Sequence, residues 1–361
     1  MNLRRPGLSQ RPARQLEIDS RLINDQGDCY VIAEIGHNHQ GELQKAKELL
    51  RRAKECGVEA VKLQKRDNRS LYTAALYNKP YDHENSFGLT YGEHREFLEF
   101  GMEEYQELKT HAQELGLTLL ATAFDIPSAD FLRELGISAY KIASGDLKNI
   151  PLIKHVASFQ KPILVSIGGG TIEDAQRVYD SVAPINSRLC FLQCTATYPA
   201  QPEEMNLRVI TVLRERFPDL VIGLSDHYNG IAMAIAAYVL GARVIEKHFT
   251  LNHTWKGTDH ALSLEPIGMQ KMVRDLHRAR AALGDGIKRV YPSEAQALKK
   301  MGKSLVAACD LPIGHRLRPE DIAIKSPGGG LAPHELDQFV GRVLRLPLHT
   351  DEFVTLQHLD G

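Results

Sequence analysis

Lysine, hydroxyl and carboxylate side chains follow short apolar runs along most of the chain, and two lysines carry the clearest chemical signal. Lys62 and Lys141 each lie at the end of such a run, and the hydroxyls of Ser144 and Ser166 follow closely. A half-buried ammonium group is costly without an anionic partner. Two of them beside hydroxyls favour an anion site that suits a small phosphorylated acid. The alternative is that each lysine pairs with an acid of the protein and binds nothing.

A glycine-rich segment, Ser166-Ile-Gly-Gly-Gly-Thr171, follows one of these runs and precedes a helical pattern. Backbone N–H groups at the start of a helix are free to bind phosphate. We therefore expect this segment to add backbone donors to the same anion site. The sequence contains no P-loop, GxSxG, HExxH or paired CxxC motif. Together with the two histidines described next, these residues indicate a metal-assisted lyase or transferase that acts on a phosphorylated carboxylate.

Two histidines, His227 and His248, lie at the ends of the last two apolar runs, with Asp226 and Glu246 beside them. Imidazole and carboxylate groups that converge in this way suit a divalent ion with open positions for substrate. Because side chains alternate along a strand, Glu246 and His248 are expected to share one face. The alternative is a pair of hydrogen-bonded core histidines in a chain that has 15 histidines.

Eight apolar runs alternate with amphipathic stretches between Val31 and Leu283, and this alternation predicts the fold. The runs are 31–35, 60–63, 118–122, 139–143, 163–166, 189–193, 221–224 and 244–245. Eight strands, each followed by a helix, are typical of a (β/α)₈ (TIM) barrel, which uses roughly 250 residues. An α/β fold with an open, doubly wound sheet is the alternative, but no GxGxxG follows the first run.

In a barrel of this kind, residues at the carboxyl ends of the strands form the catalytic mouth. The strand cores here are apolar and their ends polar, which favours an enzyme. The expected mouth residues, which we take as candidates for catalysis or substrate binding, are Glu34, Lys62, Gln64, Thr122, Lys141, Ser144, Asp146, Ser166, Gln193, Thr195, Tyr198, Ser225, Asp226, His227, Glu246 and His248.

Two segments interrupt the alternation. Residues 65–100 form a long polar insertion between the second run and its helix, and so long a loop on the active face of a barrel is usually functional. After the last helix, short runs separated by Gly and Pro predict a small β-rich domain. We therefore expect a catalytic barrel with an N-terminal extension at 1–285, a linker at 286–302 and the small domain at 303–361.

Composition excludes several classes of protein. The chain has 361 residues, with 44 Lys+Arg against 45 Asp+Glu, so its net charge of −1 speaks against a general nucleic-acid or membrane-surface binder. The longest uncharged apolar run, 230–242, is too short to cross a bilayer. The five cysteines are scattered and form no CxxC pair, which indicates reduced thiols. The first residues are basic, but they are not followed by the apolar segment that a secretory signal requires. We expect a cytoplasmic protein.

Six motifs, in order along almost the whole chain, resemble those of the sialic acid synthases (N-acetylneuraminate synthases). They are Ile32-Ala-Glu-Ile-Gly-His-Asn-His-Gln-Gly41, Val61-Lys-Leu-Gln64, Tyr140-Lys-Ile-Ala-Ser-Gly-Asp146, Gln193-Cys-Thr-Ala-Thr-Tyr-Pro199, Ile222-Gly-Leu-Ser-Asp-His227 and Ile245-Glu-Lys-His-Phe-Thr250. The tail from about Lys303 resembles the antifreeze-like (SAF) domain that ends these enzymes. Segments 90–95 and 254–266 are more similar to the animal-type (9-phosphate) synthases than to the common bacterial ones.

The resemblance implies a reaction in which phosphoenolpyruvate condenses with open-chain N-acetylmannosamine, or with its 6-phosphate in the animal type, and releases phosphate. It implies a divalent ion, Mn²⁺, Mg²⁺ or Co²⁺, that polarises the sugar aldehyde. It also assigns roles to residues: phosphoenolpyruvate binding by Lys62, Lys141, Ser144, Ser166 and Ser225; metal binding by His227 and His248; proton transfer or water positioning by Glu34 and Glu246; and sugar contacts by Gln64, Tyr198 and Asp259.

Three positions depart from the pattern of many bacterial members. Lys325-Ser-Pro-Gly328 replaces a Lys-Arg-Pro-Gly motif whose arginine meets the N-acetyl group, and animal-type members lack this arginine too. Asp146 stands where many members have Glu, and Ala196 occupies a position that is polar in some relatives. N-acetylmannosamine, its 6-phosphate and plain mannose derivatives therefore all stay open. Residues of the polar insertion either bind a sugar phosphate or are solvated: Lys79, His83 and Arg95.

Two other functions are alternatives. The first is a related phosphoenolpyruvate-dependent synthase that makes another 3-deoxy nonulosonate, deaminated or legionaminate-like, or a shorter sugar acid. The second is a carbohydrate-binding protein without catalysis. The small tail domain and the resemblance both predict a homodimer in which each tail covers the partner's barrel.

Overall fold

Eight parallel strands close into a barrel in the computed structural model, which describes residues 14–359. Neighbouring strands follow the order β10-β3-β4-β5-β6-β7-β8-β9. Their bounds are β3 (Tyr30–Gly36), β4 (Ala60–Lys65), β5 (Thr118–Ala123), β6 (Tyr140–Ile142), β7 (Ile163–Ser166), β8 (Leu189–Cys194), β9 (Val221–Asp226) and β10 (Val244–His248). This closed sheet confirms the predicted (β/α)₈ barrel and rules out the open doubly wound sheet.

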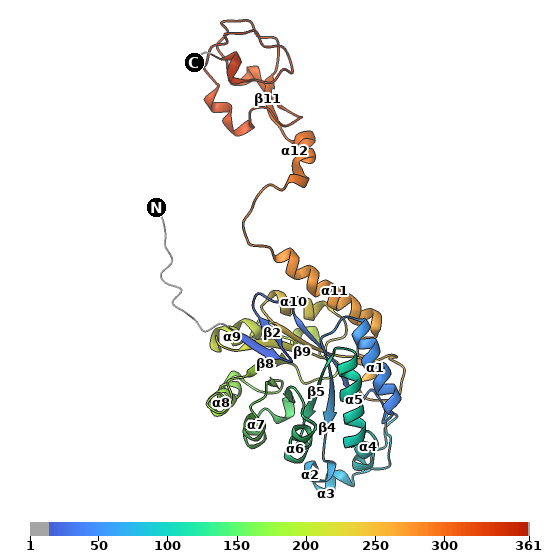
Figure 1. The fold of residues 1–361 in the computed structure, drawn as a ribbon. Coiled ribbons are helices and arrows are strands. Elements are labelled where there is room, and N and C mark those ends of the chain that lie inside the picture. Colours follow the sequence, from blue (N-terminus) through green and yellow to red (C-terminus); the bar gives the residue numbers. More distant parts are fainter. Residues whose placement is uncertain (1–13, 360–361) are drawn as a thin grey trace. The chain divides into compact units, whose positions relative to one another are not determined.

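Helices cover the outside of the barrel and connect the strands (Figure 1). In α1 the buried residues Ala46, Leu49, Leu50 and Ala53 recur at helical spacing, so one apolar face packs on the strands. The covering helices are α1 (Leu43–Glu55), α5 (Met102–Glu114), α6 (Ile126–Leu135), α7 (Ile150–Ala157), α8 (Ile172–Val182), α9 (Val209–Arg216), α10 (Ala232–Val239) and α11 (Pro266–Leu283).

Side chains inside the barrel change from apolar to polar along each strand. In β4 the alternate residues that face inward are Ala60, Lys62 and Gln64, and only Ala60 belongs to the apolar cluster at the amino-terminal end of the barrel. Gly223 in β9 leaves room for the Leu192 side chain of the neighbouring strand β8, because a Cβ at this position would lie 2.5 Å from Leu192 Cδ2. The lower half of the barrel is therefore a packed core, and the polar chemistry is confined to the upper half.

A short hairpin closes the lower end of this core. Strands β1 (Gln15–Ile18) and β2 (Arg21–Asn24) pair antiparallel, and Leu16, Ile18 and Ile23 join the barrel's inner cluster. No strand was predicted before Val31, because two four-residue strands are too short to show a reliable alternation. The basic segment 1–13 lies outside the described residues.

The polar insertion predicted at 65–100 folds into three short helices that follow β4. They are α2 (Asn68–Leu71), α3 (Ala74–Tyr77) and α4 (Tyr91–Phe97). A capping box starts α4: Thr90 Oγ1 accepts a hydrogen bond from the Glu93 amide, and the Glu93 carboxylate accepts one from the Thr90 amide. This cap fixes the direction in which α4 leaves the loop and therefore where Arg95 on that helix lies.

The chain divides into two units, residues 1–284 and residues 285–361. In the second unit, β11 (Ser304–Ala307) pairs antiparallel with β12 (Ile322–Lys325), and a small core forms around Leu305, Leu317 and Phe339. Lys325, in the stretch that departs from the bacterial motif, forms an ion pair with Asp351. Residues 286–302, predicted as a linker, contain helix α12 (Ala295–Met301), which has no buried residue.

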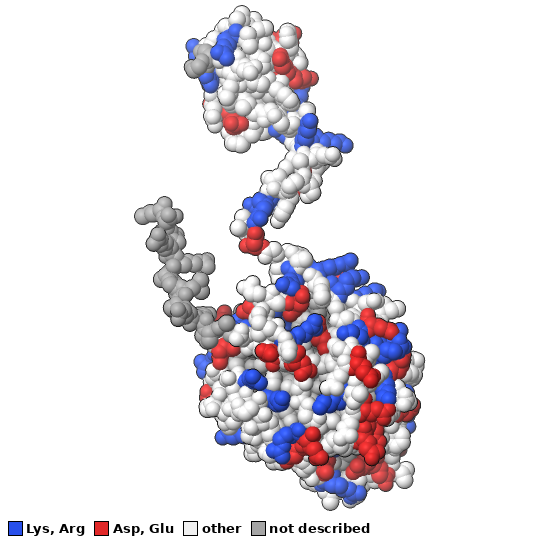
Figure 2. Space-filling view, viewed as in Figure 1, with Lys and Arg blue, Asp and Glu red and all other residues white. Residues whose placement is uncertain are grey.

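Charges of both signs are interspersed on the face of the barrel unit seen in Figure 2. This visible face therefore presents no extended basic surface of the kind that binds nucleic acid. Among residues 14–359, none of the helices combines the length and the apolar character that spanning a membrane requires.

We predict that the hairpin contributes to the stability of the barrel. Ile18→Ala removes a side chain that is 1% exposed inside the apolar cluster and should lower the free energy of unfolding by about 2–5 kcal/mol. Urea unfolding followed by circular dichroism measures the change. Leu22→Ala is the matched control, because Leu22 lies in the same hairpin and is 53% exposed; it should cost less than about 0.5 kcal/mol. Equal losses for both variants would contradict a role in the core.

Candidate active site

A cavity of about 580 Å³ opens at the carboxyl ends of the barrel strands. Most residues expected at the mouth line it, from all eight strands or the loops that follow them. These are Glu34, Lys62, Gln64, Thr122, Lys141, Ser144, Ser166, Tyr198, Ser225, His227, Glu246 and His248. Asp259, which the resemblance assigned to the sugar, lines the cavity as well. Thr122, for example, lies beside Lys141 in the pairing of β5 with β6. The strand register therefore brings together residues that are far apart in the sequence.

Two lysines and two glutamates form a charged cluster in the floor of the cavity. Lys62 Nζ lies 2.5 Å from Glu34 Oε2, 2.8 Å from Thr122 Oγ1 and 3.8 Å from Glu246 Oε1. Lys141 Nζ lies 3.4 Å from the same Glu246 oxygen. All four charged side chains are buried. The lysines thus do have acidic partners within the protein, as the alternative reading expected, and the question is whether those partners satisfy the site.

Several buried polar atoms of the cavity lining lack any hydrogen-bond partner in the protein. They include Glu246 Oε2, Ser166 Oγ and His248 Nδ1, each of which belongs to a residue that lines the cavity. Buried polar groups are almost always hydrogen-bonded, so polar atoms without a partner require an explanation. A polar ligand in the cavity provides one. The ion pairs alone leave the site unsatisfied, which favours a binding site over a purely structural charge cluster.

The electrostatics of the cluster fix its charge states. Burial by itself would raise the pKa of Glu246, but Lys141 and Lys62 outweigh it and hold that pKa at about 2. Burial lowers the pKa of Lys141, and Glu246 opposes that shift. At neutral pH Glu246 is therefore a carboxylate that cannot readily donate a proton. It can stabilise positive charge that develops beside it.

The loop after β7 positions a serine. Ser144 Oγ accepts a hydrogen bond of 3.1 Å from the Gly168 amide. A Cβ on Gly168 would lie 2.6 Å from that oxygen, so only glycine allows this approach. The amides of Gly170 and Thr171 bond to Ile167 O and Asp174 Oδ2. The expected phosphate cradle of loop amides is therefore largely committed within the protein, and the loop acts through Ser144.

Two histidines can provide a metal site. His227 Nδ1 lies 2.9 Å from the Thr195 carbonyl oxygen, so this nitrogen donates and Nε2 keeps a lone pair. Burial and the neighbouring His248 lower the pKa of His227 to about 3, which keeps the ring neutral. The ring centroids of His227 and His248 are 5.4 Å apart, and Asp259 Oδ2 lies 3.8 Å from His248 Nδ1. Two imidazoles beside a carboxylate suit a divalent transition-metal ion.

Within residues 14–359, no three His, Cys, Asp or Glu side chains lie close enough together to hold a metal ion unaided. Any ion at His227 and His248 would therefore complete its coordination with substrate or water. Such open positions are what a Lewis-acid site requires.

Four of the residues expected at the mouth do not line the cavity. Asp226 stands beside Lys247 in the pairing of β9 with β10, and its Oδ2 lies 2.9 Å from Lys247 Nζ on the outer side of the strands. Asp146, in a 3₁₀ turn after β6, accepts a hydrogen bond of 3.0 Å from Asn149 Nδ2. Strand alternation explains Asp226: its neighbour Ser225 faces inward, so Asp226 must face outward. At the end of β8, Gln193 and Thr195 also bond to backbone carbonyls outside the cavity.

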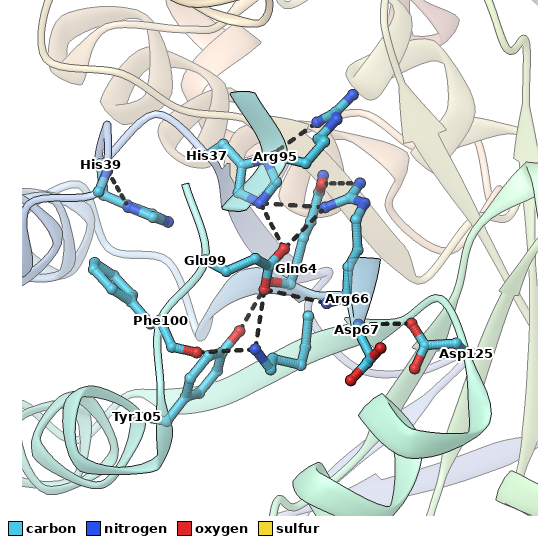
Figure 3. A network of polar contacts seen from close by, with 12 residues as sticks. His37, His39, Gln64, Arg66, Asp67, Arg95, Glu99, Phe100, Tyr105 and Asp125 are labelled. Carbon is cyan, nitrogen blue, oxygen red and sulfur yellow. Dashed lines mark hydrogen bonds and ion pairs between the residues drawn. The ribbon is translucent and has the colours of Figure 1, made fainter. Parts of the chain in front are cut away.

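The cavity has further lining residues that the sequence reasoning did not select. These are Arg66, Asn85, Phe124 and Thr258, and the previously open His83 and Arg95 also line it, whereas Lys79 does not. Figure 3 shows how Arg66 joins the site through Gln64. Gln64 Nε2 donates to Glu34 Oε1 at 2.8 Å, and its Oε1 accepts from Arg66 at 2.7 Å. Arg66 stands two residues after Gln64, so the strand alternation that selected Lys62 and Gln64 could have found it.

Residues 49–288 match the NeuB family, and residues 302–360 match the SAF domain. The chain belongs to the NeuB family. It is 39% identical over 342 residues to an N-acetylneuraminate-9-phosphate synthase of Homo sapiens, covering 94% of this chain and 95% of the relative. It is 34% identical over 339 residues to an N,N'-diacetyllegionaminic acid synthase of Legionella pneumophila, covering 92% and 95%. These matches confirm the resemblance to sialic acid synthases and the identity of the tail domain.

A solved structure supports the same assignment for this NeuB-family chain. The N-acetylneuraminic acid synthetase of Leptospira borgpetersenii, crystallised with citrate, superposes with a TM-score of 0.69 at 28% identity. The match covers 79% of this chain and 95% of that structure. The barrel fold is thus shared with the solved member.

We predict strong coupling between Lys62 and Glu34. Lys62→Met leaves the buried Glu34 carboxylate without its nearest partner and should destabilise the protein by about 3–5 kcal/mol. Adding Glu34→Gln removes the uncompensated charge and should recover at least about 1 kcal/mol. Denaturant unfolding of the two single variants and the double variant measures the coupling. Strictly additive losses would contradict a direct buried ion pair.

Proposed function

We propose that this NeuB-family chain is a sialic acid synthase that condenses phosphoenolpyruvate with an N-acetylmannosamine-type sugar and releases phosphate. The observation that carries the proposal is the buried cluster of Lys62, Lys141 and Glu246 in the lining of one cavity, where Glu246 Oε2 has no hydrogen-bond partner. Phosphoenolpyruvate has a carboxylate and a phosphate that two ammonium groups can balance. The similarity to named synthases over more than nine-tenths of the chain supports the same reaction.

In this reaction, C3 of phosphoenolpyruvate attacks the aldehyde carbon of the open-chain sugar, and C2 becomes cationic. Water then adds to C2, and phosphate leaves with cleavage of its C–O bond. Glu246, held ionised between the lysines, is the group that stabilises positive charge at C2. Lys62 and Lys141 hold the anionic groups of phosphoenolpyruvate, and the free Ser166 hydroxyl is an added donor.

Glu34 is our choice for positioning the water and accepting its proton. Its Oε1 is fixed by the Gln64 amide and its Oε2 by Lys62, so the carboxylate has one orientation. In the strand register Glu34 stands beside His248, which places it between the anion site and the histidines. Proton transfer by a positioned side chain accelerates such steps by roughly 10²–10⁴-fold.

We also propose that His227 and His248 bind a divalent ion, Mn²⁺, Mg²⁺ or Co²⁺. Such an ion, when bound, supplies Lewis acidity to the sugar aldehyde. Two neighbouring imidazoles, of which His227 has its Nε2 lone pair available, support this assignment. Tyr198, whose ring lies against both histidines, and Asp259 are then positioned to contact the sugar.

We further propose a cytoplasmic homodimer in which the SAF domain of one protomer covers the barrel of its partner. The five cysteines are all unpaired, as in a reducing compartment. Ile287, Val290 and Met301, in the segment that precedes the SAF strands, are exposed apolar side chains that a partner subunit could cover.

The proposed reaction predicts metal-dependent phosphate release from phosphoenolpyruvate when an N-acetylmannosamine-type sugar is supplied with Mn²⁺. His248→Ala should reduce the rate at least about 100-fold, because the sugar aldehyde loses its Lewis acid. His277→Ala is the matched control: His277 is exposed on α11 and its loss should leave the rate unchanged. A colorimetric phosphate assay measures both. Full activity of His248→Ala, or after exhaustive chelation, would contradict the metal site.

A chain that releases no phosphate with N-acetylmannosamine, its 6-phosphate or mannose 6-phosphate would contradict the proposed substrate class. Release with a legionaminate-type precursor would instead assign the chain to that branch of the family.

The proposed homodimer predicts twice the mass of the 40.3 kDa chain in light scattering. Specific activity should fall on dilution below the dissociation constant, because the proposed dimer places the partner's SAF domain over each barrel. A monodisperse monomer with full activity at low concentration would contradict the proposal.

A further inference from the structure

The two histidines proposed to bind a divalent ion have different backbone neighbours. The pairing of β9 with β10 ends one residue before them, at Asp226 and Lys247. The His227 carbonyl accepts a hydrogen bond of 3.0 Å from the Ala200 amide, in the loop after β8. His248 instead stands beside a residue of β3, on the other side of β10. The pairing of β9 with β10 therefore does not extend to the histidines themselves.

A side-chain ion pair joins the two strands at their last paired position. Lys247 Nζ lies 2.9 Å from Asp226 Oδ2 and also donates a hydrogen bond to the Tyr228 carbonyl oxygen. Asp226 Oδ1 accepts a hydrogen bond of 2.8 Å from the Tyr228 amide. The residues before and after His227 are thus both bound to Lys247, which itself directly precedes His248.

This ion pair lies in an otherwise apolar layer between the strands and the helices. Asp226 follows Leu224 on the outer face of β9, and both charged side chains are 0% exposed. Lys247 follows Ile245 in the same way on β10. Burying two charges is costly, and well-packed apolar side chains in their place often leave a protein equally stable or more stable. Stability alone therefore gives no reason for a charged pair here, whereas a defined placement of the two strand ends does.

One ion can bind both histidines only if their rings keep a defined separation. The ring centroids are 5.4 Å apart and the ring planes are inclined by 59°. His227 is anchored through Nδ1 to the Thr195 carbonyl oxygen, but His248 Nδ1 has no hydrogen-bond partner among residues 14–359. The placement of His248 therefore depends on the backbone that carries it. Metal ligands must be held to within about 0.5 Å of the productive geometry, so this backbone needs its own support.

We propose that Asp226 and Lys247 are positioning residues, whose ion pair behind the strand ends holds His227 and His248 at the separation at which both can bind one divalent ion. The inference rests on the proposed function, because it takes the two histidines as the metal ligands. Neither Asp226 nor Lys247 lines the cavity, so the pair acts through the backbone and contacts neither ion nor substrate. Replacing residues that orient a metal ligand typically changes metal affinity by about 10- to 100-fold.

The test removes both charges at once and measures Mn²⁺ binding by the full chain without substrates. In the double variant Asp226→Leu/Lys247→Met no uncompensated charge is left, so the chain should stay folded. The dissociation constant for Mn²⁺, measured from the electron paramagnetic resonance signal of the free ion, should rise about 10- to 100-fold. Arg214→Met is the matched control, because it breaks an ion pair with Asp25 that lies outside the cavity; the Mn²⁺ affinity should not change.

The outcomes separate this inference from the proposed function. A folded double variant with the wild-type Mn²⁺ affinity overturns the inference, because the pair is then structural only, and leaves the metal site standing. If the wild type binds no Mn²⁺, or if His248→Ala binds it equally tightly, the metal site itself has failed and the inference fails with it.

A second variant decides the question if the double variant does not fold, as circular dichroism would show. Asp226→Asn keeps an oxygen that accepts from the Tyr228 amide and loses the charge that pairs with Lys247. A lower Mn²⁺ affinity of this variant supports the inference, and an unchanged affinity overturns it.

Discussion

The ion pairs among Lys62, Lys141, Glu34 and Glu246 are the constraint on which the rest of the structure depends. Four charges inside a barrel carry a large desolvation cost, which their mutual attraction offsets only when the geometry is fixed. Each of these side chains comes from a different strand: β3, β4, β6 or β10. Only a closed barrel in the observed register can therefore bring them together. A register shift of one residue would turn every one of them outward.

The packed lower half of the barrel makes this arrangement possible. Apolar side chains from the strand starts, together with Leu16, Ile18 and Ile23 of the hairpin, fill the interior below the charges. They exclude water from beneath the cluster, which strengthens each interaction above them. Stability and chemistry are thus separated along the strand direction: the amino-terminal half holds the barrel closed, and the carboxyl-terminal half keeps polar atoms unsatisfied for a ligand.

Much of this organisation follows from the sequence, and the exceptions have physical causes. Eight apolar runs with polar ends were sufficient to predict the barrel and to place Lys62, Lys141 and both histidines in one cavity. The same reasoning selected Asp226, because it took every polar residue at a strand end and not only alternate ones. The loop amides after Ser166 look free in the sequence, but their partners are set by tertiary contacts. The hairpin was missed because short strands show little periodicity.

Different constraints fix the positions of residues in the barrel and in the insertion. The charged cluster depends on strand register, so its residues cannot change singly without leaving a buried charge unpaired. Arg95, His83 and Asn85 come from the segment between β4 and α5, where no strand pairing constrains them. Gln64 couples the two regions, because one amide group contacts both Glu34 and Arg66. The orientation of the Glu34 carboxylate in the barrel is therefore linked, through this one amide, to Arg66 at the start of the insertion.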